Sequence, residues 1–334
     1  TMMARGLIVN QVTSQIVARG FSKFFNYGEN PGIDYANLGA FEATEKLDGS
    51  LGILYWDELT STYRIATRGS FESDQAIWAT EWLQKKFPEQ VGCRESFGRA
   101  LWTLLFEIIY PDNRIIVDYH GVEGLFLIGL VDTRTAYSMP HNFVKDAGSE
   151  YGFQVVKSVQ VTNLQELLDL ASKPTGKPTD EEGWVVFWPK AQLRVKIKRD
   201  DYMQLARILS RMSARAVFEA VRDGTFEDLV KDLPTELASV PRLLEAEVRA
   251  TQLPVLTDAD RAWFILCRFV KPGMSRKDVA MLIKGDVQLV SHASYLFSRI
   301  DNHDTGKWIW SKVEEHLKKL GYFVRRLPTE EITP

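Results

Sequence analysis

The pattern of apolar and polar positions changes its period near residue 205. Before that point, short apolar runs are separated by clusters of Gly, Pro, Asn and Asp, which is typical of strands joined by turns. After it, apolar residues recur every three or four positions, as on one face of a helix. The predicted strands cover residues 7–9, 51–56, 63–67, 101–110, 125–131, 183–188 and 194–198.

Helical periodicity predicts one helix in the first part, over residues 74–87, and a series of helices in the second part. We expect breaks in this series at Pro241, Pro254, Pro272-Gly273 and Gly321. The pattern therefore predicts an α+β fold, with an antiparallel-sheet domain over residues 1–205 and an all-helical domain over residues 206–334. The predicted helices of the second domain cover residues 203–221, 236–250, 258–270, 276–283, 288–300 and 307–320.

Composition narrows the class of protein. The 41 Lys and Arg residues nearly balance the 44 Asp and Glu residues, so a site for a polyanion must be a local cluster of cations. Cys93 and Cys267 are too few for a disulfide framework and too far apart for a zinc site. Neither an apolar run of about 20 residues nor a signal-peptide pattern is present. We expect a soluble, cytosolic protein without membrane contact, and nothing in the sequence demands more than a monomer.

The first candidate for chemistry is Lys46, within the segment Glu45-Lys46-Leu47-Asp48-Gly49-Ser50. A lysine amine is a nucleophile only when its surroundings leave it neutral. Lys46 precedes a glycine turn and an apolar strand from which its side chain could be held in place. The alternative is a hairpin turn at Asp48-Gly49 with a solvated lysine beside it, because K-x-D-G is short enough to arise by chance.

Further charged residues are embedded in apolar strands, where they cost free energy unless they are paired or used. Glu107 is flanked by apolar residues on both sides, and Glu182 stands at the mouth of a strand. Alternation along the last strand puts Arg194, Lys196 and Lys198 on one face. Three cations on one face suit a phosphate and would lower the pKa of a nearby lysine. An exposed sheet face with scattered salt bridges is the alternative.

Taken in order, these segments resemble the covalent nucleotidyltransferases, which comprise polynucleotide ligases and messenger-RNA capping enzymes. The signature is a K-x-D-G motif, then a glutamate on an apolar strand, an E-G strand and a K-x-K strand. Within this superfamily the chain is most similar to the type-1 RNA ligases typified by the T-even phage enzyme. The resemblance runs from about residue 4 to residue 202. It includes Ala4-Arg5-Gly6, Lys23-Phe24-Phe25-Asn26, Glu29-Asn30-Pro31, Arg68-Gly69-Ser70, Pro111-Asp112-Asn113-Arg114 and Lys196-Ile197-Lys198 with Asp200 and Tyr202.

The resemblance implies an ATP-grasp-like nucleotidyltransferase domain and an ATP-dependent RNA ligase. Lys46 would attack the α-phosphorus of ATP and carry AMP as a phosphoramide. The AMP would pass to the 5′-phosphate of an RNA strand, and a 3′-hydroxyl would then seal the ends. The implied partners are single-stranded or nicked loop ends of RNA, as in RNA repair or the repair of tRNA anticodon loops. A viral enzyme would act in the host cytosol.

The resemblance also implies residue roles. Lys196 and Lys198 would contact the α-phosphate and help to keep Lys46 unprotonated. Glu182 would organise Mg²⁺ (or Mn²⁺), mostly through water, whereas Asp48 is expected to fix the loop around Lys46. The remaining nucleotide-binding residues would be Arg5 and Lys23 at the phosphates or ribose, Arg68 near the nucleotide, Glu107 at the ribose hydroxyls, and Glu45.

The helical second part bears on specificity. DNA ligases and capping enzymes place a small β-barrel after the K-x-K strand, and the helical periodicity here argues against that barrel. Type-1 RNA ligases carry a helical domain associated with RNA recognition, so we expect residues 206–334 to contribute to RNA specificity. A GTP-dependent guanylyltransferase and a DNA ligase with an unusual C-terminal part stay open as alternatives.

Overall fold

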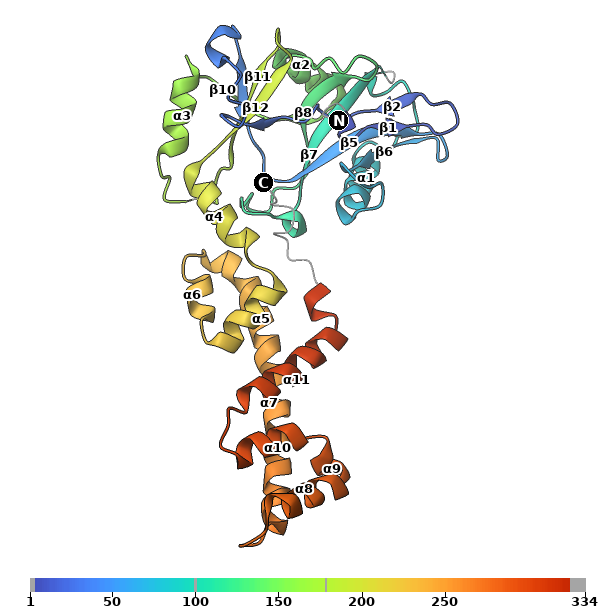
Figure 1. Cartoon of the computed structure of the whole chain (residues 1–334). Helices are drawn as coiled ribbons and strands as arrows, with labels where there is room; N and C mark the ends of the chain where they lie inside the picture. Colours follow the sequence, from blue (N-terminus) through green and yellow to red (C-terminus); the bar gives the residue numbers. More distant parts are fainter. Residues whose placement is uncertain (1–3, 99–100, 178, 325–334) are drawn as a thin grey trace. The chain divides into compact units, whose positions relative to one another are not determined.

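The computed structural model (Figure 1) describes residues 4–98, 101–177 and 179–324. The backbone separates into two units, Thr1–Arg207 and Ile208–Pro334. The first is rich in antiparallel strands and the second is helical, so the predicted α+β class is confirmed. Among the described residues, no helix combines the length and the apolar character needed to span a bilayer.

Two five-stranded sheets form the centre of the first unit. One has the order β6-β5-β7-β8-β9 and the other the order β10-β4-β11-β12-β3. Neighbouring strands are antiparallel, except that β9 joins β8 and β3 joins β12 in parallel. A third, two-stranded sheet pairs β1 with β2. The strands are β1 (Ile8–Val9), β2 (Ile16–Ala18), β3 (Phe25–Asn26), β4 (Glu42–Glu45), β5 (Ser50–Asp57), β6 (Thr62–Ala66), β7 (Trp102–Ile109), β8 (Gly124–Asp132), β9 (Gln154–Val155), β10 (Ser158–Val159), β11 (Gly183–Trp188) and β12 (Leu193–Lys198).

Helices cover the outer faces of these sheets. The helices α1 (Asp74–Lys86) and α2 (His141–Tyr151) pack against the β5–β8 sheet, and α3 (Leu164–Ser172) packs against β12 (Figure 1). A serine begins α1, because the Ser73 side chain accepts a hydrogen bond from the Ala76 N–H. Two 3₁₀ turns, Tyr35–Asn37 and Pro111–Asn113, lie in the connections.

Alternation along the strands decides which side chains enter the core and which lie on the opposite face of the sheet. On β7, Leu104, Phe106 and Ile108 are fully buried in the core beneath α1 and α2. Burying each of these side chains contributes about 1.5–3 kcal/mol, so a one-residue slip of the strand would be costly. The register therefore holds Glu107 on the opposite face. On β12, Val195 and Ile197 enter a second core, which leaves the cations of this strand on the other face.

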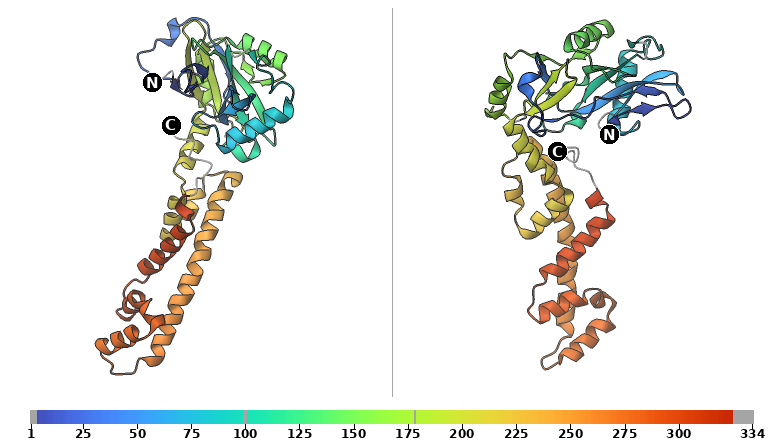
Figure 2. Two further views of the ribbon diagram at one scale, coloured as in Figure 1. Left: turned by 90° about the vertical axis from the view of Figure 1, so that its right-hand side faces the viewer. Right: turned by 45° about the horizontal axis from the view of Figure 1, so that its top comes forward.

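The second unit is built around one long helix. This helix, α7 (Thr235–Phe269), packs against α5 and α11, which Figure 2 shows beside it. The other helices of the unit are α5 (Ala214–Asp223), α6 (Phe226–Val230), α8 (Arg276–Gly285), α9 (Val287–Val290), α10 (Ala293–Ile300) and α11 (Gly306–Lys319), and the 3₁₀ turn Tyr322–Val324 follows. The remaining helix, α4 (Asp200–Ser210), spans the boundary between the units.

Two predicted helix breaks are wrong. Pro241 and Pro254 both lie inside α7, which runs through residues 235–269 without interruption. An interior proline costs about 3 kcal/mol because it removes a hydrogen bond and crowds the preceding turn. Here the cost is offset by packing, since Leu244, Val248 and Ala262 on the same helix are buried.

Other boundaries differ because of capping residues and short elements. The single helix expected over 203–221 is two helices, because Ser213 caps a new one by accepting a hydrogen bond from the Ala216 N–H. Asp286 likewise starts α9 by accepting hydrogen bonds from the Gln288 and Leu289 N–H groups, and the helix expected over 288–300 is divided because α9 ends at Val290 and α10 begins at Ala293. The strands β2, β3, β4, β9 and β10 were not predicted, because two- to four-residue strands carry no periodic pattern. The helices α2, α3 and α6 were not predicted either.

Candidate active site

Lys46 lies in the connection that leads from β4 in one sheet to β5 in the other. Its backbone N–H donates to the Gly183 carbonyl at 2.8 Å, and Gly183 pairs with Lys198 across β11 and β12. This row of three neighbours puts Lys46 and Lys198 on the same face. The side chain of Lys46 is 20% exposed, so it is reachable from solvent although most of it is covered.

Glu182 joins the two lysines. One carboxylate oxygen, Oε2, lies 2.5 Å from Lys46 Nζ, and the other, Oε1, lies 2.9 Å from Lys198 Nζ. The Glu182 side chain is 2% exposed, so its charge is compensated by these two ammonium groups rather than by water. The glycine after it is required by geometry, because Gly183 has φ +143° and a Cβ there would lie 2.1 Å from the Ile197 carbonyl oxygen.

The carboxylates reverse the expected effect on Lys46. Burial alone would lower the pKa of the Lys46 ammonium, but Glu182 and, more weakly, Glu107 and Asp48 raise it above its ordinary value. The prediction that neighbouring cations keep Lys46 unprotonated is therefore wrong for this arrangement. The sequence showed the cations on β12 but not that a single buried carboxylate would lie between two of the lysines.

The lowered pKa is found at Lys196 instead. Burial, followed by the charges of Lys46, Lys198 and Arg5, lowers the pKa of Lys196 to about 8. Its Nζ lies 5.3 Å from the centre of the Phe24 ring, where the ring supplies little of the solvation that water would give. Lys196 is thus a cation that can lose its proton near neutral pH.

Asp48 holds the loop that carries Lys46. Its Oδ2 accepts hydrogen bonds from the Ile116 and Val117 N–H groups at 2.9 and 3.0 Å, and its Oδ1 accepts one from the Tyr202 hydroxyl at 2.9 Å. The Asp48 N–H in turn donates to the Tyr119 hydroxyl at 2.6 Å. Both carboxylate oxygens of Asp48 therefore bind groups of the protein itself. Tyr119 was not predicted as a site residue, because it lies 71 residues from Asp48 along the chain and on no strand.

Glu107 faces the same loop. The Gly49 N–H donates to Glu107 Oε1 at 3.0 Å, and a Cβ at Gly49 would lie 2.4 Å from the Ile108 carbonyl oxygen. Burial raises the pKa of Glu107 to about 7, although Lys46 opposes the rise. The glycine of K-x-D-G therefore lets the motif loop approach β7 closely enough to bind this carboxylate.

The other predicted nucleotide-binding residues lie around this centre or away from it. Arg5 is half-buried, and the charges that act on it are those of Arg68 and Glu107. Lys23 is exposed, with Nζ 4.9 Å from the centre of the Phe25 ring. Glu45 pairs with Trp184 on the core-facing side of the sheet, and its Oε1 lies 3.9 Å from Lys157 Nζ. The structure therefore brings Lys46, Lys198, Glu182 and Glu107 together, and it does not bring Glu45 to them.

The sequence model of the family described as RNA ligase matches residues 3–202, which include every residue of this cluster. The chain belongs to this family. A "Putative RNA ligase" of Thermovibrio ammonificans is 30% identical over 148 residues, which cover 44% of this chain and 37% of the relative. An "RNA ligase" of Rhodothermus phage RM378 is 23% identical over 310 residues, which cover 73% of this chain and 68% of the relative.

A solved structure titled "Archaeal ATP-dependent RNA ligase - form 1" is also similar. It aligns with a TM-score of 0.47 and 18% identity over 72% of this chain and 66% of that chain. The chain thus spans only part of the length of the RNA ligases that it matches.

The cluster combines ammonium groups with carboxylates. Within residues 4–98, 101–177 and 179–324, no three His, Cys, Asp or Glu side chains are grouped as a metal site. Mg²⁺ commonly keeps several waters and binds through substrate phosphates with one or two carboxylates. Among the described residues, Glu182 is the carboxylate that contacts both Lys46 and Lys198.

Proposed function

We propose that this chain is an ATP-dependent RNA ligase that joins 5′-phosphate and 3′-hydroxyl ends through AMP carried on Lys46. The observation that carries the proposal is the arrangement of Lys46 and Lys198 on the two oxygens of Glu182. This arrangement sits in a chain of the RNA ligase family, with Lys196 on the same face as Lys198. It supplies a lysine nucleophile, cations for phosphate oxygens and a carboxylate for a metal ion.

The first step is attack by the Lys46 amine on the α-phosphorus of ATP. A P–N bond forms, the bond to the β-phosphate oxygen breaks, and pyrophosphate leaves. Before attack Lys46 must lose a proton, and Glu182 Oε2 at 2.5 Å is the nearest acceptor among the described residues. Lys196 and Lys198 stabilise the charge that gathers on the non-bridging oxygens. A divalent ion, when bound, would neutralise further charge on the phosphates.

In the second step, an oxygen of an RNA 5′-phosphate attacks the AMP phosphorus and the P–N bond breaks, which returns Lys46 to the amine. The RNA end then carries AMP through a pyrophosphate linkage. In the third step, an RNA 3′-hydroxyl attacks the 5′-phosphorus, AMP leaves, and a phosphodiester is formed. The same cations serve all three steps, because each is a phosphoryl transfer with charge on non-bridging oxygens.

The remaining roles are part of the proposal. Glu107, which binds the motif loop through Gly49, is proposed to hold ribose hydroxyls, and Arg5, on which the charges of Arg68 and Glu107 act, is proposed to contact the nucleotide together with Arg68. The helical unit is proposed to select the RNA ends. Single-stranded or nicked loop ends as substrates, Mg²⁺ as the metal, a monomeric state and a cytosolic location stay predictions.

Labelled nucleotides test the proposal. The chain is incubated with Mg²⁺ and either ATP or GTP labelled at the α-phosphate, and the covalent label is measured after denaturation. We expect label from ATP. Joining is then compared between RNA and DNA strands that carry 5′-phosphate and 3′-hydroxyl ends, and we expect RNA to be preferred. Label from GTP alone, or joining of DNA alone, would contradict the proposal and favour a guanylyltransferase or a DNA ligase.

A further inference from the structure

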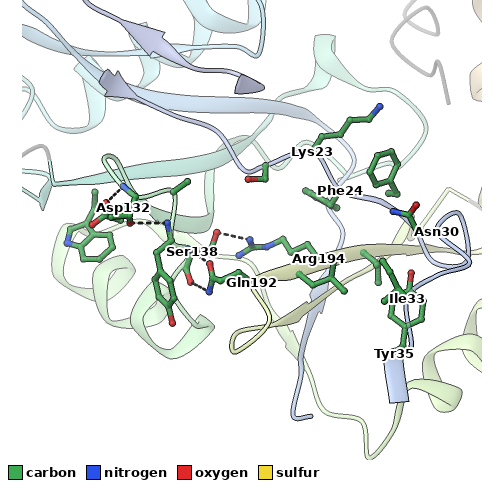
Figure 3. A pocket seen from close by; sticks show the side chains of 17 residues that line it. Lys23, Phe24, Asn30, Ile33, Tyr35, Asp132, Ser138, Gln192 and Arg194 are labelled. Carbon is green, nitrogen blue, oxygen red and sulfur yellow. Dashed lines mark hydrogen bonds between the residues drawn. The ribbon is translucent and has the colours of Figure 1, made fainter. Parts of the chain in front are cut away.

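A cavity of about 860 Å³ lies in the first unit (Figure 3), and neither Lys46 nor Glu182 lines it. Its wall combines cations, amides, aromatic rings and one carboxylate, Asp132, from segments that are far apart in the sequence. Asp132 Oδ1 accepts hydrogen bonds from the Arg134 and Thr135 N–H groups. The residues that carry the argument are Lys23, Phe24, Asn30, Tyr137, Ser138 and Arg194. Its volume falls within the range of sites for small molecules, about 300–1,000 Å³, and suits one nucleotide.

Arg194 is the principal charge of this cavity. Its guanidinium lies 3.8 Å from the ring centre of Phe187, its cross-strand partner, and 4.0 Å from that of Phe21. Nη1 donates to Ser138 Oγ at 2.8 Å, as Figure 3 shows. Within the described part of the chain, no carboxylate forms an ion pair with Arg194. Burial lowers its pKa to about 9, opposed only by the charge of Glu42.

Arg194 is a partly buried cation without a carboxylate partner among the described residues, so an anion would stabilise it. A guanidinium has five N–H donors in a planar fork that matches the oxygens of a phosphate. The two rings fix the plane of the Arg194 guanidinium, and Ser138 accepts one of its hydrogen bonds. An anion bound by the remaining donors would compensate the charge that burial penalises.

The cavity continues the cation row of the active site. Arg194, Lys196 and Lys198 are alternate residues of β12, so all three point to one face. At about 3.3 Å per residue, the Cα of Arg194 lies about 13 Å from that of Lys198. A chain of phosphates could therefore run along this face from the Lys46–Glu182 pair toward Arg194.

Aromatic side chains are the second feature that this cavity shares with sites for single-stranded nucleic acid. Tyr137 lines the cavity and is 45% exposed, and Tyr35, Phe24 and Phe25 line it as well. Cations that follow a backbone, together with rings on which bases stack, are typical of proteins that bind single-stranded nucleic acid. A mononucleotide site alone would not need a row of cations that leads away from the nucleophile.

We propose that this cavity binds one nucleotide of the RNA substrate near the end to be joined, with its phosphodiester on Arg194 and its base against Tyr137. The inference rests on the proposed function, and it names the part of the enzyme that holds the RNA. The phosphates of ATP are the other source of the same chemistry, so the test separates the two.

The test measures two reactions of the full chain with Arg194→Gln and Tyr137→Ala. The first is adenylylation of the enzyme by ATP without RNA, and the second is sealing of pre-adenylated RNA without ATP. We expect Arg194→Gln to raise the KM for pre-adenylated RNA about 10- to 100-fold, because a hydrogen bond to a charged group is lost. Tyr137→Ala should raise it about 5- to 100-fold through lost stacking. Adenylylation should change less than about twofold in both variants.

Matched variants control for general effects. Arg94→Gln removes an arginine that also lies over a ring, that of Trp56, and Phe143→Ala removes an aromatic side chain that is 45% exposed, like Tyr137. Neither lines the cavity, so both should seal RNA with the KM of the unaltered chain. If Arg194→Gln does not fold, Tyr137→Ala decides, because its side chain is exposed.

Three outcomes contradict the inference in different ways. An unchanged KM for RNA in both variants would show that the cavity holds no nucleotide of the substrate. Impaired adenylylation with normal sealing would assign Arg194 to the phosphates of ATP. If the unaltered chain itself joins no RNA, the proposed function fails as well, which the labelling experiment detects separately.

Discussion

The ammonium nitrogen of Lys46 lies 2.5 Å from Oε2 of Glu182, whose side chain is 2% exposed. The proposed nucleophile is therefore held as a charged ion pair, and the raised pKa of Lys46 follows from this contact and the weaker effects of Glu107 and Asp48, which together outweigh burial. Attack on phosphorus requires this pair to be separated or its proton to be transferred. Glu182 thus both positions Lys46 and favours its protonated form.

Replacing Lys46 tests the nucleophile directly. Lys46→Ala and Lys46→Arg should both abolish covalent AMP, because alanine has no amine and arginine stays protonated. The measurement is the label that remains on the denatured chain after incubation with α-labelled ATP. Lys157→Ala is the matched control, since Lys157 is 81% exposed and should be dispensable. Label retained at the normal level in either Lys46 variant would refute the assignment.

Lys198→Ala should slow adenylylation about 10²- to 10³-fold. The reason is the loss of one cation aimed at the transition-state charge, which is the usual cost of removing such a donor. Glu182 would keep Lys46 as its partner, so the variant should fold. Single-turnover labelling at saturating ATP measures the rate of the chemical step. A normal rate would remove Lys198 from the active site.

Alternation along strands made part of the active site predictable. The period of two on β12 correctly put Arg194, Lys196 and Lys198 on one face, because Val195 and Ile197 must reach the core. The order of the charged segments was equally visible in the sequence. Both depend only on local pattern, which sequence reasoning handles well.

Long-range geometry could not be predicted in the same way. Nothing near Lys46 in the sequence indicates that Tyr119 and Tyr202 would hold Asp48, since these contacts join residues 71 and 154 positions apart. The predicted direction of the pKa shift at Lys46 was wrong for the same reason. It depends on the distance to Glu182, which a list of nearby cations does not contain. In α7, by contrast, the local signal itself was misleading. Pro241 predicted a break, but tertiary packing keeps the helix continuous.

The pKa of Lys196, about 8, predicts a pH dependence. Lys196 is charged below this pH and neutral above it, so its attraction for the phosphates of ATP is lost as the pH rises through 8. Lys196→Arg stays charged across this range. We therefore compare kcat/KM for ATP between Lys196→Arg and the unaltered chain. We expect the value of the variant, divided by that of the unaltered chain, to be constant near pH 7 and to rise above pH 8. The ratio cancels the titration of Lys46, which both proteins share, and kcat/KM reports the free enzyme. A ratio that stays flat from pH 7 to pH 9 would show that Lys196 does not titrate there.

Gly183→Ala should cost both stability and activity, because this position combines two demands. Its φ is +143°, which is a region for glycine, and an added Cβ would lie 2.1 Å from the Ile197 carbonyl oxygen. The backbone atom cannot rotate away as a side chain can, so the pairing of Gly183 with Lys198 must open. Opening it displaces Glu182, the preceding residue, from both lysines.

Gly176→Ala separates these two demands, because Gly176 also has a positive φ, +73°, but no heavy atom within 4 Å of an added Cβ. It should lower the free energy of unfolding by about 1 kcal/mol, the cost of a left-handed backbone alone. Gly183→Ala should lower it by about 3 kcal/mol or more and reduce adenylylation at least about 100-fold. Urea unfolding and the labelling rate measure the two effects. Equal losses in the two variants would mean that strand pairing tolerates the Cβ, and that the glycine after Glu182 is needed only for its backbone angle.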